Sequence, residues 1–457
     1  MVNAMKSKNK KRFKTIVPQP LRTINPDVAG IDIGSEEIYV AIPADRAIES
    51  VRVFATFTAD LHTLRDWLLE HRIKSVAMES TGVYWIPLYD VLEKAGITVC
   101  LVNARYVKNV PGRKTDVLDC QWLQQLHSYG LLKSSFRPSE EIRQLRAIAR
   151  QQDMLKRYRA AHIQHMEKAL HEMNIQIDNV LNDITGVTGL AILRAIVAGE
   201  HDPRLLAQHR DPRCRSTQEV IEKSLEGTYL DEHLFELQQA LELYDFYSEK
   251  IANCESRLHS LYKNTTSSPD YPDSPLPPKK VQKQTETWNE LYRMCGVDLT
   301  RIDGLNVSSV QTIITEVGTD MSKWPTFKHF ASWLALCPNN KITGGRVVAT
   351  TKKKTTNRAT TALRLAARSL HFSKSALGAF YRHTVARCGP KIAIKATAHK
   401  IARILYIMLK NHLDFQAVDE SQYEQQNKER SLRNLYSKAA KLGYKLVPKE
   451  TLIPIPV

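Results

Sequence analysis

Four acidic residues stand where a carboxylate is costly unless it has a chemical role. Asp32 interrupts the apolar run Val28-Ala-Gly-Ile-Asp-Ile33, and Glu79 ends a second apolar run, Ser75-Val-Ala-Met-Glu79. Both runs are typical of buried strands, in which an isolated carboxylate has to be paired or bound to a metal. Asp116 and Asp119 follow three residues apart, so on a helix they share one face.

Four carboxylates brought together would repel one another strongly unless a divalent cation neutralised them. Oxygen ligands favour Mg²⁺, with Mn²⁺ as an alternative, and two such ions are the usual means of attacking or releasing phosphodiester oxygens. Any one of these acids alone could be an ordinary solvated residue. The set of four therefore predicts a metal site acting on a phosphate ester.

The elements around these acids predict an α/β domain over about residues 27–160. Strands are expected at 28–33, 37–42 and 50–57 with short turns between them, which suits an antiparallel meander. A helix at 61–71, a strand at 75–79, a helix at 85–94 and a strand at 97–102 follow. Three antiparallel strands and then alternating helix and strand is the order of the ribonuclease H-like (RuvC-like) fold. A Rossmann domain would alternate from its start and carry a glycine-rich turn after its first strand.

The segment from Asp116 to Leu126 is expected to be helical. Leu118, Trp122 and Leu126 recur at helical spacing, and this row is predicted to pack on the sheet. Asp116 and Asp119 would then lie beside the carboxyl ends of the strands that carry Asp32 and Glu79.

Beyond this domain the chain is mainly helical. A long helix is expected from 139 to 174, and a helical or coiled-coil region spans 161–262, where a heptad-like row within 219–262 packs either inside the chain or against a partner helix. A Pro- and Ser-rich linker (263–284) precedes a C-terminal domain (285–415) and a tail (416–457). Glycine turns at 184–189 and 302–308 could be phosphate-facing helix-hairpin-helix elements or plain corners between packed helices.

The positive charge is concentrated in one part of the chain. The formal net charge is +17, yet residues 321–413 contain 18 Lys and Arg and no Asp or Glu, so this block holds the whole excess. A solvated surface normally mixes signs, and such a block favours a polyanionic partner, nucleic acid first.

Other features exclude several classes of protein. The seven cysteines include no Cys-x-x-Cys pair, which fits reduced thiols in the cytoplasm and argues against a zinc finger. No apolar run reaches the length of a transmembrane helix. Residues 1–26 read as a disordered basic arm, since no apolar segment follows the early lysines as it would in a signal peptide.

A motif in the C-terminal part of the chain is specific enough to indicate a protein family. Trp333-Leu-Ala-Leu-Cys-Pro-Asn-Asn-Lys-Ile-Thr-Gly-Gly-Arg346 is followed by Lys352-Lys-Lys-Thr-Thr-Asn-Arg358 and then by a helix from 359 to 370 with Arg364 and Arg368 on one face. Together with the four acids, this motif resembles the transposases of the IS110/IS1111 insertion-sequence family, most nearly the IS1111 branch, over about residues 27–412.

The resemblance implies a RuvC-like domain, a coiled-coil insertion and a C-terminal transposase domain. Its four acids match Asp32, Glu79, Asp116 and Asp119, and the position of its nucleophilic serine is Thr343 here. A threonine hydroxyl can attack phosphorus, although its extra methyl hinders the approach. Gly344 and Gly345 would let a DNA backbone come close. The cations expected to neutralise nucleic acid are Arg346, Lys352, Lys353, Lys354, Arg358, Arg364 and Arg368.

The resemblance further implies a structured noncoding RNA, the bridge RNA encoded by the element, that pairs with donor and target DNA. It also implies an active site assembled between protomers of a dimer or tetramer, in a bacterial, nucleoid-associated protein. Three alternatives remain open. They are a RuvC-type metal-dependent nuclease such as a junction resolvase, with water as the nucleophile; an actin-like or sugar-kinase ATPase, which shares the Asp-Ile-Gly strand; and a non-catalytic nucleic-acid-binding protein.

Overall fold

The structure is a computed structural model that describes residues 22–80, 82–103, 116–268, 276–351 and 357–447. Two compact units divide the chain, residues 1–137 and 138–457, and each is described by itself. Most of the expected basic arm and the residues Lys352, Lys353 and Lys354 lie outside the described ranges.

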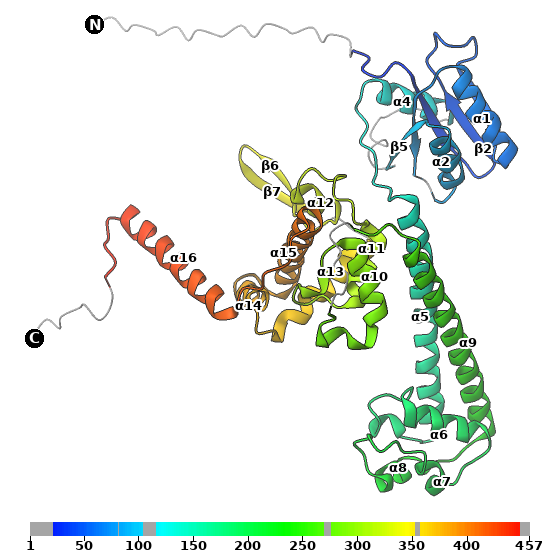
Figure 1. Ribbon diagram of the computed structural model, residues 1–457, viewed down its shortest axis with the longest axis vertical. Coiled ribbons are helices and arrows are strands. Elements are labelled where there is room, and N and C mark those ends of the chain that lie inside the picture. Colours follow the sequence, from blue (N-terminus) through cyan, green and yellow to red (C-terminus); the bar gives the residue numbers. More distant parts are fainter. Residues whose placement is uncertain (1–21, 81, 104–115, 269–275, 352–356, 448–457) are drawn as a thin grey trace, which may run out of the picture. The chain divides into compact units, whose positions relative to one another are not determined.

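A mixed five-stranded sheet forms the centre of the N-terminal unit (Figure 1). Its strands are β1 (Val28–Ile33), β2 (Glu37–Ala41), β3 (Val51–Ala55), β4 (Ser75–Glu79) and β5 (Thr98–Val102), in the order β3-β2-β1-β4-β5. The first three strands pair antiparallel, whereas β4 and β5 run parallel to β1. This is the arrangement expected of the ribonuclease H-like fold, and the predicted strands agree with it to within two residues.

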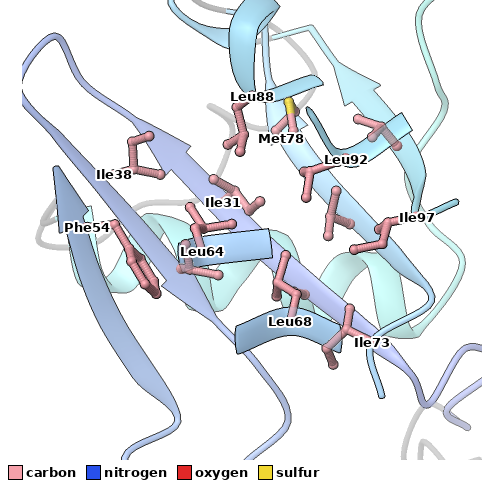
Figure 2. Packing of buried hydrophobic residues seen from close by; sticks show 14 of the residues in the cluster. Ile31, Ile38, Phe54, Leu64, Leu68, Ile73, Met78, Leu88, Leu92 and Ile97 are labelled. Carbon is pink, nitrogen blue, oxygen red and sulfur yellow. The ribbon is translucent and has the colours of Figure 1, made fainter. Parts of the chain in front are cut away.

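The main core of this unit lies on one face of the sheet. The strands alternate their side chains, so Ile31 and Met78 point toward α1 (Thr58–Glu70) and α2 (Trp85–Lys94), where Leu64 and Leu88 are fully buried. Figure 2 shows this apolar packing between the sheet and the two helices. Because this face is filled with hydrocarbon, the polar residues of β1 and β4 face the opposite side.

The helix α4 (Asp116–Ser128) covers part of that opposite side. Its buried residues include Cys120 and Leu123, and Leu123 joins a small cluster with Ala77 and Val102 of the sheet. The predicted row of Leu118, Trp122 and Leu126 was wrong at Leu118, which is 48% exposed, whereas Trp122 and Leu126 are partly buried. The helix is rotated because its backbone, between Cys120 and Gln124, contacts a glycine of β1 directly.

The second unit begins with two long helices, α5 (Glu140–Glu172) and α9 (Asp231–Lys263), which pack along one another. The apolar row predicted on α9 packs inside the chain, since Leu237, Leu241 and Tyr244 are buried in the core shared with α5. The short helices α6 (Val187–Val197), α7 (Pro203–Ala207) and α8 (Gln218–Ser224) join the two long ones. The long helical stretch expected within 219–262 is α9, and the shorter α8 precedes it.

The C-terminal part of this unit is a set of packed helices. They are α10 (Thr285–Cys295), α11 (Val307–Val317), α12 (Phe327–Trp333), α13 (Arg358–Ser369), α14 (Ala376–Cys388), α15 (Pro390–Asn411) and α16 (Glu420–Lys441). A two-stranded hairpin of β6 (Asn339–Thr343) and β7 (Arg346–Thr351) lies between α12 and α13 in the sequence.

The turn before α11 packs closely against α13. A Cβ on Gly304, whose φ is +86°, would lie 2.6 Å from the carbonyl oxygen of Ala366 in α13. This turn is therefore a corner packed against another helix, where only glycine fits. All seven cysteines are free, as expected. Among the described residues, no helix is both long and apolar enough to cross a membrane.

Candidate active site

The strand register brings Asp32 and Glu79 together. Ile31 of β1 pairs with Met78 of the parallel strand β4, so the next residue on each strand is one of the two acids. Adjacent strands are about 4.8 Å apart, and equivalent residues point to the same face. Since Ile31 and Met78 point into the core, Asp32 and Glu79 both point to the face that α4 covers.

Gly30 determines how closely α4 approaches this face. A Cβ added to Gly30 would lie 2.1 Å from the carbonyl oxygen of Cys120 and 2.2 Å from the amide nitrogen of Gln124. Both are backbone atoms, which cannot rotate away as a side chain could. Gly30 precedes Asp32 by two residues and so lies on the same face, and this close contact places the first turn of α4, with Asp116 and Asp119, beside Asp32.

The electrostatics of Asp32 confirm that the four acids are neighbours. Its pKa is raised from 3.8 to about 6, first by burial of the half-buried carboxyl group and then by the charges of Asp119, Asp116 and Glu79. Three like charges that oppose the ionisation of a fourth carboxyl are what a site built for a cation requires. The sequence prediction that these four residues converge is thus met by the structure.

The donor set suits a hard divalent cation. Four carboxylates offer only oxygen ligands, which Mg²⁺ and Mn²⁺ prefer over the nitrogen and sulfur ligands typical of zinc. Among the described residues, these four do not supply three ligand atoms that all lie within 4.8 Å of one another.

A different group does meet that distance criterion in the second unit. Ligand atoms of Glu172, His233 and Glu236, on α5 and α9, all lie within 4.8 Å of one another. The ammonium of Lys168 is 3.2 Å from Glu172 and 3.8 Å from Glu236, so it already forms ion pairs with both carboxylates. We interpret this group as an ion-pair cluster that joins the two long helices.

Tyr39 and Glu37 were missed by the sequence analysis. Tyr39 is the antiparallel partner of Asp32, and directly paired residues share a face. Its hydroxyl donates a hydrogen bond of 2.8 Å to Glu37, and this bond, with the nearby charges of Glu37 and Asp116, raises the pKa of Tyr39. The signal that could have revealed them is the alternation along β2, because residues 37, 39 and 41 follow the register of Asp32.

Thr343 lies at the end of the β6–β7 hairpin. It pairs with Arg346 across the turn Gly344-Gly345, in which both glycines have positive φ, +56° and +76°. Two-residue hairpin turns of type I′ require this conformation at both central positions. A Cβ on either glycine would meet nothing within 4 Å. The turn geometry is therefore sufficient reason for both glycines, and Thr343 is exposed beside them.

The predicted cations fall into two groups. Arg346, Arg364 and Arg368 are exposed, the last two on the outer face of α13. Arg358, at the first residue of α13, is instead held inside the chain by ion pairs with Asp153 and, at 3.8 Å, with Glu316. Its charge is already neutralised in this arrangement, so it differs from the freely exposed cations.

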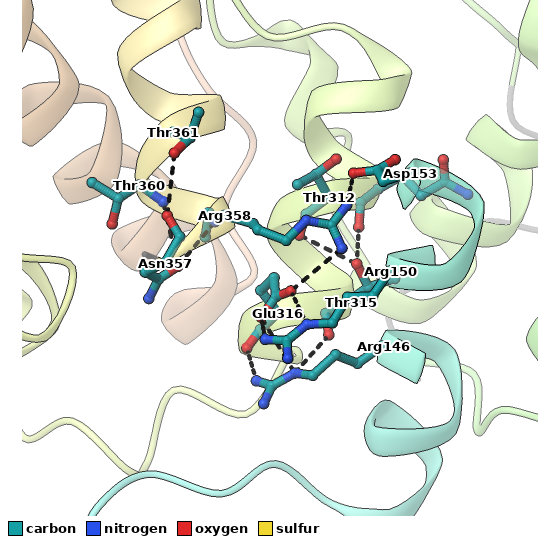
Figure 3. A network of polar contacts seen from close by, with 12 residues as sticks. Arg146, Arg150, Asp153, Thr312, Thr315, Glu316, Asn357, Arg358, Thr360 and Thr361 are labelled. Carbon is teal, nitrogen blue, oxygen red and sulfur yellow. Dashed lines mark hydrogen bonds and ion pairs between the residues drawn. The ribbon is translucent and has the colours of Figure 1, made fainter. Parts of the chain in front are cut away.

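Figure 3 shows the network to which Arg358 belongs. Glu316 of α11 is nearly buried, with 5% of its side chain exposed, and accepts two hydrogen bonds of 2.8 Å from Arg150 of α5. Arg146 of the same helix lies 3.4 Å from the Glu316 carboxylate, and burial lowers the Arg146 pKa to about 10. The network joins α5, α11 and α13.

The ribonuclease H-like sheet and the four acids on one of its faces define a phosphodiester-processing enzyme of the DEDD type. Residues 29–175, which contain all four acids, match the model of a transposase family named for its DEDD motif and for IS110. Residues 297–382, which contain Thr343 and α13, match the transposase family IS116/IS110/IS902. The two matches together cover about half of the chain, and the chain belongs to the IS110 family of transposases. No curated protein matches it. It is thus an enzyme that acts on DNA.

Proposed function

We propose that the protein is a transposase of the IS1111 branch that cuts and rejoins donor and target DNA through the hydroxyl of Thr343. A structured noncoding RNA of the element guides it to its sites. The observation that carries the proposal is the convergence of Asp32, Glu79, Asp116 and Asp119 beside one sheet face. Catalysis on DNA by such a set needs a nucleophile, and the accessible Thr343 supplies one.

The covalent step is a transesterification. The Thr343 oxygen attacks the phosphorus, the P–O bond to one deoxyribose breaks, and that deoxyribose oxygen leaves with a proton. The DNA end is then joined to Thr343 as a phosphate ester. A deoxyribose hydroxyl of the other DNA repeats the reaction in reverse, which restores the phosphodiester and frees Thr343. No oxidant and no nucleotide hydrolysis is needed, since one ester replaces another.

The carboxylates would hold the Mg²⁺, or Mn²⁺, that this chemistry uses. When bound, the cation supplies charge neutralisation at the phosphate and makes the threonine hydroxyl easier to ionise. Asp32 and Glu79 project from adjacent strands and Asp116 and Asp119 from the first turn of α4, so the strands and the helix fix the ligands independently of Thr343.

The proposed site is composite, because the acids and Thr343 belong to separate units of the chain. We therefore expect a homo-oligomer, a dimer or a tetramer, in which one protomer can supply the acids and another the hydroxyl. The exposed Arg346, Arg364 and Arg368 would bind the DNA backbone around the scissile phosphate. Lys352, Lys353 and Lys354 are proposed for the same role on the basis of the sequence. Arg358 would join them only if it left Asp153.

The proposed guide RNA rests on the family resemblance, and the basic composition is compatible with it. The protein would act on the bacterial chromosome, in the cytoplasm and associated with the nucleoid. These assignments can be tested together with the nucleophile if the cleavage substrate is the junction of the element with its flanking DNA.

The decisive experiment is a cleavage assay on this junction DNA with the flanking noncoding RNA and Mg²⁺, read on a denaturing protein gel. We expect a slowly migrating protein–DNA adduct that is absent with Thr343→Ala and with Asp32→Ala. Thr343→Ser serves as the matched control because it retains the hydroxyl. Omitting the RNA should abolish cleavage at the correct site.

One structural observation favours a second candidate, a RuvC-type nuclease with water as the nucleophile. The Gly-Gly turn beside Thr343 is explained by its backbone conformation alone. Thr343 could then be an ordinary strand residue, as Thr often is. If DNA cleavage yields no protein–DNA adduct and is retained by Thr343→Ala, this candidate is favoured and the threonine ester is excluded.

A further inference from the structure

We infer that the C-terminal half of α16, together with the residues that follow it to 447, binds the phosphate backbone of a nucleic acid through residues that are not part of the proposed active site. This segment lies beyond both family matches, which end at residue 382. The inference concerns an additional binding surface and does not depend on the identity of the nucleophile.

The first half of α16 is fixed to the rest of the unit by its acidic residues. Glu420 forms an ion pair with Arg382 of α14, and Glu424 lies 2.8 Å from His383 of the same helix. The ammonium of Lys400, on α15, lies between the rings of Phe380 and Tyr423, 4.4 and 5.1 Å from their centres. These contacts supply acidic partners to the block that contains no acid of its own.

The second half of the segment has a different character. Residues 428–447 contain six basic residues and one acid, Glu429, a net charge of +5. No residue of α16 is buried, and from 428 to 447 all but Ala439 are exposed. The six cations are Lys428, Arg430, Arg433, Lys438, Lys441 and Lys445. Because this part of the helix packs against so little of the protein, burial of apolar side chains hardly stabilises it. We therefore expect a bound ligand to stabilise it.

The basic surface continues from α16 onto α15. The positive charges of Arg430 and Arg403 lower the pKa of Lys400, in addition to the effect of its burial. Within the described ranges, no carboxylate lies at ion-pair distance from Arg403, Lys400 or Arg430. Cations that repel one another and lack acidic partners form a surface that a polyanion would stabilise.

A nucleic acid fits this segment better than a second copy of the chain. The segment does expose apolar side chains, Leu432, Leu435 and Tyr436 on α16 and Leu442 at its end. They span only about three turns, and so short a contact buries less than the roughly 1,200 Å² of a stable interface. Two such segments side by side would also bring two charges of +5 together. Arg430, Arg433 and Lys441 lie on another side of the helix, where they are free to contact phosphates.

The test compares two full-length variants. In the first, Arg430, Arg433, Lys438 and Lys441 are all replaced by Gln; in the control, each is replaced by the other basic residue, Arg→Lys or Lys→Arg. Neither variant touches the acidic anchors, and circular dichroism and melting temperature verify the fold. Fluorescence anisotropy then measures the Kd for a labelled duplex DNA without element sequence, and for a structured RNA hairpin, over a range of NaCl concentrations.

We expect the Gln variant to bind at least about ten-fold more weakly, with a salt-dependence slope smaller by about 2 to 3, because each phosphate contact contributes about 0.9 to that slope. The control should match the wild type. If affinity is lost for DNA alone, the ligand is DNA, and if it is lost for RNA alone, the ligand is RNA. If affinity is lost for both, the segment recognises the phosphate backbone that DNA and RNA share. Each of these results supports the inference.

Two results would overturn it. One is a Gln variant whose affinities stay within two-fold of the wild type for both ligands, with an unchanged slope. The other concerns the double variant Leu432→Ser and Leu435→Ser. If this variant sediments as a smaller species than the wild type, and if nucleic-acid affinity does not depend on the four cations, the segment mediates contact between copies of the chain.

Discussion

Replacing Gly30 by alanine should separate the two halves of the acidic site. The added Cβ would lie 2.1 Å from the carbonyl oxygen of Cys120, whereas ordinary contact begins at 3.4 Å. The helix α4 must therefore retreat by about 1 Å or more, and Asp116 and Asp119 move with its first turn. The strand itself cannot yield easily, because β1 is paired on both sides.

The structure gives the size of the effect. Forcing one extra carbon into a packed interface costs about 1–3 kcal/mol of folding free energy. A displacement of about 1 Å between reacting groups lowers a rate by about 100-fold. Gly30→Ala should thus leave the protein folded but destabilised, with cleavage of junction DNA reduced by about two orders of magnitude and with weaker Mg²⁺ binding.

Three measurements check this prediction: urea unfolding, the rise in melting temperature on addition of Mg²⁺, and single-turnover DNA cleavage. Gly186→Ala is the matched control. Gly186 has an ordinary φ of −73°, and a Cβ there would meet only one carbonyl oxygen, that of Asp183, at 3.2 Å. We expect it to change stability slightly and leave Mg²⁺ binding intact. Wild-type cleavage and an undiminished Mg²⁺ shift in Gly30→Ala would refute the role assigned to the close packing of α4.

Three further predictions follow. In the metal-free protein the pKa of Asp32 is about 6 when folded and near 3.8 when unfolded, so the folded state binds the proton more tightly. The contribution of Asp32 to the free energy of unfolding should therefore fall by about 1–2 kcal/mol as pH rises between these values. Asp119→Asn should reduce that fall in urea titrations done with EDTA. Glu316→Gln should destabilise the chain by about 2–4 kcal/mol, because it leaves partly buried guanidinium groups without this carboxylate. The control Asp245→Asn breaks an exposed ion pair and should cost less than about 1 kcal/mol. Equal urea midpoints for the two variants would contradict this prediction. Thr343→Ser should form the protein–DNA adduct at least as fast as the wild type, since it keeps the hydroxyl and loses the methyl; gels that show no adduct for Thr343→Ser would count against the proposed nucleophile.

The sequence was sufficient to predict the sheet and the acids on it. Several strands of the N-terminal unit are short apolar runs, and Asp32 and Glu79 are conspicuous because each stands in such a run. These are local patterns, and they constrain the local structure directly.

The orientation of α4 could not be predicted in the same way. The spacing of apolar residues favoured the row Leu118, Trp122 and Leu126, but the helix buries Cys120 and Leu123, because its backbone fits over Gly30. This contact depends on a missing side chain on another element. The internal pairing of Arg358 with Asp153 was equally inaccessible, because the two residues are about 200 positions apart and neither lies in an apolar pattern.

The β6–β7 hairpin has a consequence for local stability. Every side chain described in it is exposed, including those of Ile342, Val347 and Val348 at 63, 54 and 69%. A two-stranded hairpin without a packed face is at best marginally stable, so its cross-strand amide protons should exchange with solvent far faster than those of β1. Ordering the hairpin against DNA would then consume part of the binding free energy. If amide exchange in the hairpin slows only when a correctly matched DNA is bound, ordering of the hairpin depends on recognition of the site. Recognition would then be coupled to the placement of Thr343 at the phosphate.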